Sequence, residues 1–378
     1  MRPVSGHHSS GALPLTLTYS GASEILSDPD QDPVYYSAVT VQESTGATKV
    51  WDAIGFLDGR CGAAMVHIST NDVFDGTLGR PLEGVPAVHA VNQGGLLDVA
   101  LDPDFASNRL VYLSYAEPRE GGNGTAVARG TLTDRGLDGV QVIFRQDVTI
   151  NGRHHFGSRL VFDRDGLLYV TLGDRGEMAR AQRPDDHAGK ILRLTDDGRP
   201  APGNPFIGDP KARPEIFSLG NRNVQGAALN PSTGVLWAHE HGPQGGDELN
   251  AIRAGANYGW PVITYGVNYV SGTKIGEGTE KAGMAQPVKY WVPSPALSGM
   301  AFYQGDRFSK WRGDVLIGAL RGQALIRVRL DGERFVEDEF MLVGNLPRVR
   351  DVRVGPDSLV YLLTDLPNGA ILRLEPAG

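Results

Sequence analysis

Cysteine is almost absent from this 378-residue chain, because Cys61 is the only one, and an intrachain disulfide is therefore excluded. No stretch approaches the ~20 consecutive apolar residues of a membrane-spanning helix, so we expect no membrane span. The formal net charge of -8 predicts no nucleic-acid partner, although an acidic protein can still hold a local cationic pocket. The first residues also lack the charged-then-apolar order of a signal peptide.

Long helical patterns are hard to place, whereas turn residues are abundant. Glycine accounts for 50 residues and is scattered rather than periodic, which indicates many turns and an all-β fold. One phrase recurs along the chain: an apolar pair, a polar turn and a β-rich run. Its clear copies are LDPDFASNRLVYLSY, FDRDGLLYVTLGD, LNPSTGVLWAHEH, KWRGDVLIGAL and VGPDSLVYLLTD, in which Tyr112, Tyr169, Leu236, Leu316 and Tyr361 are equivalent.

A sixth, weaker copy, AIGFLDGRCGAAMVHIST, occupies residues 53–70. Six such units are typical of a six-bladed β-propeller, whose active site lies at the mouth of the central channel. We therefore expect a single propeller domain over residues 50–378, preceded by an N-terminal segment, residues 1–49, to which we assign no structure. A pair of β-sandwich domains is the alternative, although no linker rich in proline and serine divides the chain.

Two adjacent histidines in NGRHHFGSRL are the first candidates for chemistry. On an extended chain His154 and His155 point to opposite sides, so only one of them faces a given site and the other supports it. A lone histidine at the start of a strand is more often structural than catalytic. The histidines alone leave both roles open.

Arginines strengthen the case for a site. Arg222 lies in SLGNRNVQGAAL, Arg321 in GALRGQAL, and Arg348 and Arg350 are two apart in NLPRVRDVRVG, where they share one face of a β-like run. Two adjacent guanidinium groups need an anion, a carboxylate partner or free solvent between them. Four arginines at one channel mouth suit a ligand with several carboxylates, and a solvated strand edge is the alternative.

The segment WAHEHGPQGGDELNAIRAGANYGWP favours calcium over zinc. Its His-Glu-His run alternates as in a strand and lacks the helical spacing of a zinc protease. The Gly242-Pro243 turn presents backbone carbonyls, and Asp247 and Glu248 supply the hard oxygen ligands that calcium prefers. A polar loop without a metal is the alternative.

Together these segments resemble the soluble aldose sugar dehydrogenases and glucose/sorbosone dehydrogenases that use pyrroloquinoline quinone. The similarity runs from about Asp75 to the C-terminus, and everything before about Val50 has no recognisable counterpart. The motifs that carry it, in the family's order, are NQGGLLDVALDPDF, HHFGSRLVFDRDGLLYVTLGD, HAGKILRL, NRNVQGAALNP, HEHGPQGGDELN, NYGWP, SGMAFY and RVRDVRVGPDSLVYLLTD.

The resemblance implies a six-bladed propeller with the quinone over the channel mouth and the general base at His155. The implied cofactor contacts are Gln93, His154, Arg222, Asn223, Arg321, Arg348 and Arg350, with His154 in a supporting role and Arg321 where relatives often have lysine. The catalytic calcium is implied at the backbone carbonyls of Gly242 and Pro243. A second, structural calcium is implied at Glu248 and Tyr258.

The implied reaction oxidises the anomeric hydroxyl of aldose mono- and disaccharides to lactones. His155 removes the proton, calcium and Arg222 stabilise the oxygen that becomes negative, and an external acceptor receives the electrons. The resemblance also implies a periplasmic or secreted protein. Two other classes stay open: a calcium-dependent hydrolase of the lactonase type, which needs an acid-rich ring around its metal, and a non-catalytic sugar-binding propeller, against which the intact His155 counts.

Overall fold

The computed structural model describes residues 82–133, 135–355, 357–365 and 371–376, together with the backbone of β1 (Val4–Ser5) and β2 (Leu15–Tyr19). The helices in these ranges are short: α1 (Phe105–Asn108), η1 (Met178–Gln182) and η2 (Ser309–Trp311). None of them has the length and apolar character that crossing a membrane requires. The fold is an all-β propeller, as predicted.

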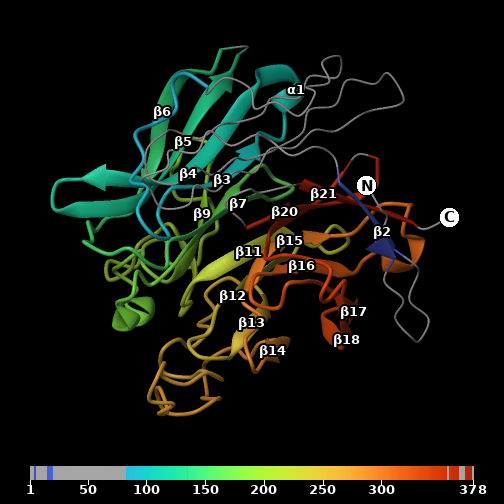
Figure 1. The fold of residues 1–378 in the computed structure, drawn as a ribbon. Helices are drawn as coiled ribbons and strands as arrows, with labels where there is room; N and C mark the ends of the chain where they lie inside the picture. Colours follow the sequence, from blue (N-terminus) through green and yellow to red (C-terminus); the bar gives the residue numbers. More distant parts are fainter. Residues whose placement is uncertain are drawn as a thin grey trace, which may run out of the picture. The chain divides into compact units, whose positions relative to one another are not determined.

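One compact unit covers residues 82–294 and contains three antiparallel four-stranded sheets (Figure 1). The first consists of β3 (Leu96–Leu101), β4 (Leu110–Arg119), β5 (Gly122–Leu132) and β6 (Leu137–Arg145). The second consists of β7 (Gly157–Phe162), β8 (Leu168–Leu172), β9 (Lys190–Leu194) and β10 (Ile216–Leu219). The third consists of β11 (Val224–Leu229), β12 (Leu236–Glu240), β13 (Asp247–Ala251) and β14 (Lys289–Trp291).

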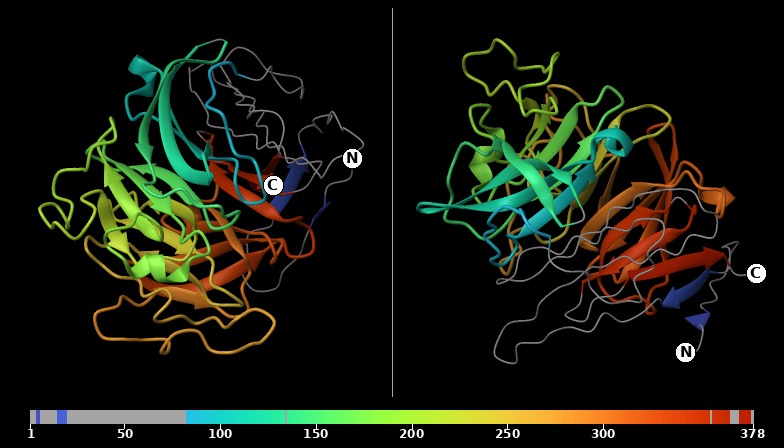
Figure 2. Two further views of the ribbon diagram at one scale, coloured as in Figure 1. Left: turned by 90° about the vertical axis from the view of Figure 1, so that its left-hand side faces the viewer. Right: turned by 90° about the horizontal axis from the view of Figure 1, so that it is seen from above.

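A second compact unit covers residues 295–376 and includes β1 and β2. Its first sheet consists of β15 (Leu297–Phe302), β16 (Val315–Ala319), β17 (Ala324–Asp331) and β18 (Arg334–Met341). Its second sheet has the order β1-β2-β21-β20-β19, with β19 (Val349–Val354), β20 (Val360–Thr364) and β21 (Ile371–Pro376). The blue strands near the N-terminus lie beside the red C-terminal strands in both views of Figure 2, where β2 pairs antiparallel with β21.

The recurring phrase of the sequence leads into the strand that lies next to one edge strand of each sheet. The five residues predicted to be equivalent all lie on a strand that is second from an edge of its sheet, namely on β4, β8, β12, β16 and β20. The last four of these strands are buried along their whole length, which explains their near-continuous apolar runs. Neighbouring sheets within the 82–294 unit share apolar clusters, one of which joins Tyr112 and Val127 to Leu168 and Leu192.

The described residues form five sheets, where the sequence predicted six units. The sixth unit, residues 53–70, lies outside the described residues, as does most of the predicted N-terminal segment 1–49. The single domain over residues 50–378 stays a prediction.

Candidate active site

Backbone geometry sets the position of His155. It lies in the histidine loop, residues 151–156, which leads into β7, and its φ of 55° is in the left-handed region. A Cβ at Gly173, directly after β8, would overlap the carbonyl oxygen of His155, so only glycine permits this close approach. The two histidines therefore do not alternate along an extended strand, and our argument from strand alternation was wrong, because the chain turns before β7 begins.

The imidazole of His155 is oriented by a buried carboxylate. Its Nδ1 lies 2.6 Å from Oδ1 of Asp174, which also accepts a hydrogen bond from the backbone N–H of Gly176. The indole N–H of Trp260 donates to the other oxygen of Asp174 at 2.7 Å. Burial alone would raise the pKa of Asp174, but these hydrogen bonds outweigh it and hold the pKa below its usual value. An ionised Asp174 places the proton on Nδ1 and leaves the lone pair of Nε2 for a substrate.

Gln93 and His154 are two predicted site residues that neighbour His155. The backbone N–H of His155 donates to Oε1 of Gln93 at 2.8 Å, and the N–H of Gln93 donates to the carbonyl of Arg153. The side chain of His154 is exposed and hydrogen-bonds to none of the described residues. Its ring centroid lies 6.3 Å from that of His155, so both predicted residues border the site.

Arg222 and Asn223 are fixed by one buried carboxylate. Glu240, at the end of β12, accepts hydrogen bonds from the backbone N–H groups of both residues and, at 2.9 Å, from the side chain of Asn221. Burial raises the pKa of Glu240 to about 7. Asn223 Oδ1 in turn accepts from the N–H of Gly157 at 3.2 Å, at the start of β7.

The guanidinium of Arg222 is buried and has spare donor capacity. Nη1 donates to the carbonyl of His241 at 3.1 Å, and the group lies 5.4 Å from the ring of Trp260. Its Nε is buried and has no hydrogen-bond partner among the described residues. The backbone N–H of Asp174 donates to the carbonyl of Arg222, which places the arginine beside the His155 pair.

The turn after β12 fits a hard cation. Gly242 and Pro243 are buried, and within the described part of the chain neither carbonyl accepts a hydrogen bond. The turn is fixed from the opposite side, where Asp247 accepts from the N–H of Gly242 at 3.1 Å and from the hydroxyl of Ser294 at 2.7 Å. Two buried carbonyls without donors are suitable ligands for calcium.

The second predicted calcium site is less complete. Glu248 lies opposite Glu240 on paired strands, and burial together with the charge of Glu240 raises the pKa of Glu248 well above its usual value. A nearby cation would relieve this repulsion. The hydroxyl of Tyr258, however, already donates to the carbonyl of Ala251 and accepts from the N–H of Arg253. The described residues contain no group of three His, Cys, Asp or Glu side chains suited to a metal.

The other predicted arginines lie in the 295–376 unit. Arg348 and Arg350 share the carboxylate of Asp365, at 2.7 Å from Nε of Arg348 and 3.0 Å from Nη2 of Arg350. Burial would raise the pKa of Asp365, but the two guanidinium groups outweigh it and lower the pKa. Arg321 is exposed, and its side chain hydrogen-bonds to none of the residues that the structure describes. One carboxylate cannot neutralise two arginines, so a net positive charge remains for an anionic ligand.

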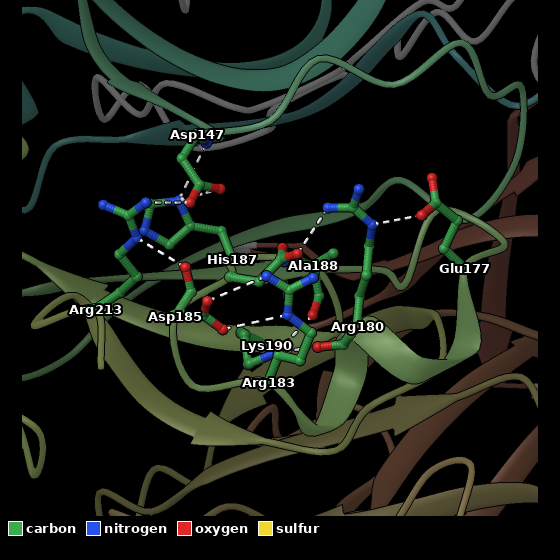
Figure 3. A network of polar contacts seen from close by, with 10 residues as sticks. Asp147, Glu177, Arg180, Arg183, Asp185, His187, Ala188, Lys190 and Arg213 are labelled. Carbon is green, nitrogen blue, oxygen red and sulfur yellow. Dashed lines mark hydrogen bonds and ion pairs between the residues drawn. The ribbon is translucent and has the colours of Figure 1, made fainter. Parts of the chain in front are cut away.

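The connection from β8 to β9, which carries Asp174, is held by a buried lysine. Figure 3 shows Lys190 among its charged neighbours, where its Nζ donates to the carbonyls of Arg180 at 2.8 Å and Ala188 at 2.6 Å. Burial lowers the pKa of Lys190 to about 7. Arg180 is itself paired with Glu177 and Asp186. This network fixes the connection that carries Asp174, the partner of His155.

Three residues of the site were not singled out from the sequence: Asp174, Glu240 and Trp260. Each lies inside a motif that was recognised, at the end of TLGD, in HEHGP and in NYGWP. The available signal was an acidic residue at the end of a buried strand, as in Glu240, or two residues after it, as in Asp174. The donors that hydrogen-bond to such a carboxylate depend on contacts between strands that are distant in sequence, and the spacing of residues within one motif does not reveal those contacts.

Comparison with known proteins places the chain among sugar dehydrogenases. The sequence profile of the family described as Glucose / Sorbosone dehydrogenase matches residues 62–373. Aldose sugar dehydrogenase YliI of Escherichia coli strain K12 is 48% identical over 304 residues, which are 79% of this chain and 82% of that protein. A crystal structure of a glucose dehydrogenase aligns with a TM-score of 0.83 and 43% identity, covering 95% of this chain and 99% of the other.

A structure of the PQQ-bound form of aldose sugar dehydrogenase from Streptomyces coelicolor has a TM-score of 0.68 and 31% identity, with 91% of this chain and 99% of that chain covered. The profile match begins earlier than the motifs read by eye, at residue 62 rather than about Asp75. With this coverage and the His155 site in place, the chain belongs to the glucose/sorbosone dehydrogenase family.

Proposed function

We propose that this protein is a quinoprotein that oxidises aldose mono- and disaccharides at the anomeric hydroxyl, with pyrroloquinoline quinone and calcium. The observation that carries the proposal is the hydrogen bond between His155 and Asp174, which lies next to the spare donor of Arg222. A base, a fixed positive charge and a cation-binding turn, linked through the hydrogen bonds from Asp174 to Arg222 and from Arg222 to His241, suit removal of a proton together with transfer of negative charge.

His155 takes the proton of the anomeric hydroxyl on Nε2, and Asp174 stabilises the imidazolium that forms. Arg222 stabilises the negative charge that develops as the sugar is oxidised. The carbonyls of Gly242 and Pro243 would hold calcium, which would supply a Lewis acid. Pyrroloquinoline quinone supplies the two-electron acceptor when it is bound, and an external acceptor then removes the electrons.

The cofactor contacts remain part of the proposal. Gln93, His154 and Asn223 border His155 or Arg222, and Arg321, Arg348 and Arg350 offer guanidinium groups to the carboxylates of the quinone. For the three arginines of the 295–376 unit, the support for a role in cofactor binding comes from the sequence motifs. We also infer a six-bladed propeller, a structural calcium at Glu248 and Tyr258, and a periplasmic or secreted location, as in the family resemblance.

Reconstitution tests the proposal. Chelated protein is mixed with pyrroloquinoline quinone and calcium, and reduction of an artificial dye is followed with glucose, other aldoses and disaccharides. We expect dye reduction only when both quinone and calcium are present. Lactone hydrolysis by protein without quinone would support the hydrolase instead, and sugar binding without turnover would support the non-catalytic propeller.

A further inference from the structure

Arg175, the residue after Asp174, is a buried cation without a carboxylate partner. It is 3% exposed, and none of the described acidic residues lies within salt-bridge distance of it. Burial, followed by the positive charge of Arg119, lowers the pKa of Arg175 to about 10, so it stays protonated at neutral pH. Burying an unpaired guanidinium is unfavourable unless its hydrogen bonds compensate. The hydrogen bonds of Arg175 therefore indicate its role in the structure.

Those contacts converge on the histidine loop. Nε donates to the carbonyl of His154 at 3.0 Å, and Nη2 donates to the carbonyl of Gly152 at 2.9 Å. The guanidinium also lies 3.6 Å above the ring of Phe156. Arg175 thus contacts the residues on both sides of His155, His154 and Phe156, and also Gly152, the third residue before it.

A second side chain completes the arrangement. Asn123, on β5, accepts from Nη2 of Arg175 at 2.6 Å and donates to the same carbonyl of Gly152 at 3.0 Å. The loop is thereby tied to the first sheet and to the connection after β8. Because a left-handed backbone is unfavourable for residues other than glycine, His155 keeps its φ of 55° only where its surroundings hold it there.

We propose that Arg175 is a positioning residue for the sugar oxidation. It clamps the carbonyls of Gly152 and His154 and thereby keeps the imidazole of His155 in line with Asp174. The inference rests on the proposed function only for its effect on turnover, since the clamp itself belongs to the protein without cofactor. Arg175 touches neither the imidazole nor the predicted cofactor contacts through its side chain, apart from the backbone of His154.

The first test uses the protein without quinone. In histidine-labelled protein, the Nδ1 proton of His155 held at 2.6 Å from Asp174 gives a downfield NMR resonance, assigned by its absence from His155→Ala. Arg175→Lys keeps the charge but cannot donate to two carbonyls in fixed directions or stack as a plane. We expect the resonance to shift or broaden in Arg175→Lys and in Arg175→Met.

The matched control is Arg193→Lys. Arg193 also lies beside aromatic rings, those of Tyr169 and Phe217, and pairs with Asp163 at 3.2 Å. Arg193 pairs with Tyr169 near the start of β8, whereas the histidine loop lies beside the other end of this strand, where Leu172 pairs with Gly157. The substitution, like Arg175→Lys, replaces a guanidinium beside aromatic rings by an ammonium group, and we expect the His155 resonance to keep its wild-type position.

The second test uses the reconstituted enzyme. We expect kcat to fall by ~10–100-fold in Arg175→Lys, the range for a misplacement of about 1 Å, while the affinity for pyrroloquinoline quinone is unchanged. An unchanged resonance together with wild-type kcat in Arg175→Lys would overturn the proposal. If wild-type protein oxidises no aldose, the proposed function fails, and the resonance alone then decides whether Arg175 positions His155. If Arg175→Met does not fold, Arg175→Lys alone still tests whether Arg175 positions His155.

Discussion

Replacing Asp174 by asparagine tests the orientation of the base directly. All three partners of Asp174 are donors: His155 Nδ1, the backbone N–H of Gly176 and the indole N–H of Trp260. An amide has one oxygen and one NH₂ group, so no placement of it satisfies all three donors. With the oxygen toward Trp260, the amide donor faces Nδ1 and the proton moves to Nε2. With the oxygen toward His155, the negative charge that stabilises the imidazolium is lost.

Either outcome removes most of the rate acceleration that a positioned base provides. We expect kcat of Asp174→Asn to fall by ~10²–10⁴-fold, equivalent to about 3–5.5 kcal/mol of transition-state stabilisation. The assay is dye reduction with glucose at saturating quinone and calcium. Quinone affinity should remain near that of wild type, because Glu240 fixes the backbone of Arg222 and Asn223, and Asp247 fixes the Gly242-Pro243 turn.

Asp163→Asn is the matched control. Asp163 lies in the turn between β7 and β8 and pairs with Arg193, at the other end of the same hairpin. We expect wild-type kcat in this variant despite the lost ion pair. Wild-type turnover in Asp174→Asn, or an equal loss in the control, would refute the assignment of Asp174 as the group that orients His155.

Other predictions concern the histidines, calcium and substrate range. His155→Ala should bind quinone but lose ~10²–10⁴-fold in kcat, whereas His154→Ala should lose about tenfold at most; the reverse order would assign the base to His154. Quinone titrations of chelated protein should show weak binding that calcium strengthens, and equal affinity without the metal would remove calcium from the site. Specificity constants should be similar for several mono- and disaccharides, because we expect the segment 268–283 to meet the far end of the sugar and this segment is largely exposed, with few fixed polar contacts to offer; a thousandfold preference for one sugar would contradict this. Burial opposes protonation of His187, but hydrogen bonds with Asp147 and Glu215 outweigh it and raise its pKa, so His187 stabilises the fold below about pH 6.5 and this stability is lost as the pH rises through the raised value. The thermal midpoint of His187→Gln should therefore fall below wild type most at about pH 5.5 and least at about pH 8.5, and a constant difference would contradict the linkage.

The sequence predicted the repeated part of the fold well, because that part depends on local patterns. Apolar runs such as LYVTL and VYLLT form strands that are buried on both faces, and the polar turns before them connect these strands to the preceding ones, as predicted. The unit at residues 53–70 carries the weakest copy of the phrase and lies outside the described residues, so the sequence stays the sole basis for a sixth blade.

The site was predicted less completely, because its geometry depends on groups distant in sequence. The pairing of Arg348 and Arg350 required an anion, a carboxylate or solvent between them, and Asp365, fifteen residues after Arg350, provides the carboxylate. The strand argument for His154 and His155 failed because a left-handed residue breaks the alternation. That conformation depends on the approach to Gly173, which no local pattern near the histidines indicates.

The most direct test of the account is reduction of bound quinone in a single turnover, with no dye present. Protein loaded with pyrroloquinoline quinone and calcium is mixed with glucose, and the absorption of the quinone is followed in wild type and in His155→Ala. We predict that wild type reduces one quinone per chain and that His155→Ala binds the same amount but reduces it ~10²–10⁴-fold more slowly. Absence of any spectral change with every aldose tested, or equal rates in the two proteins, would contradict the claim that His155 is the base of a quinone-dependent sugar oxidation.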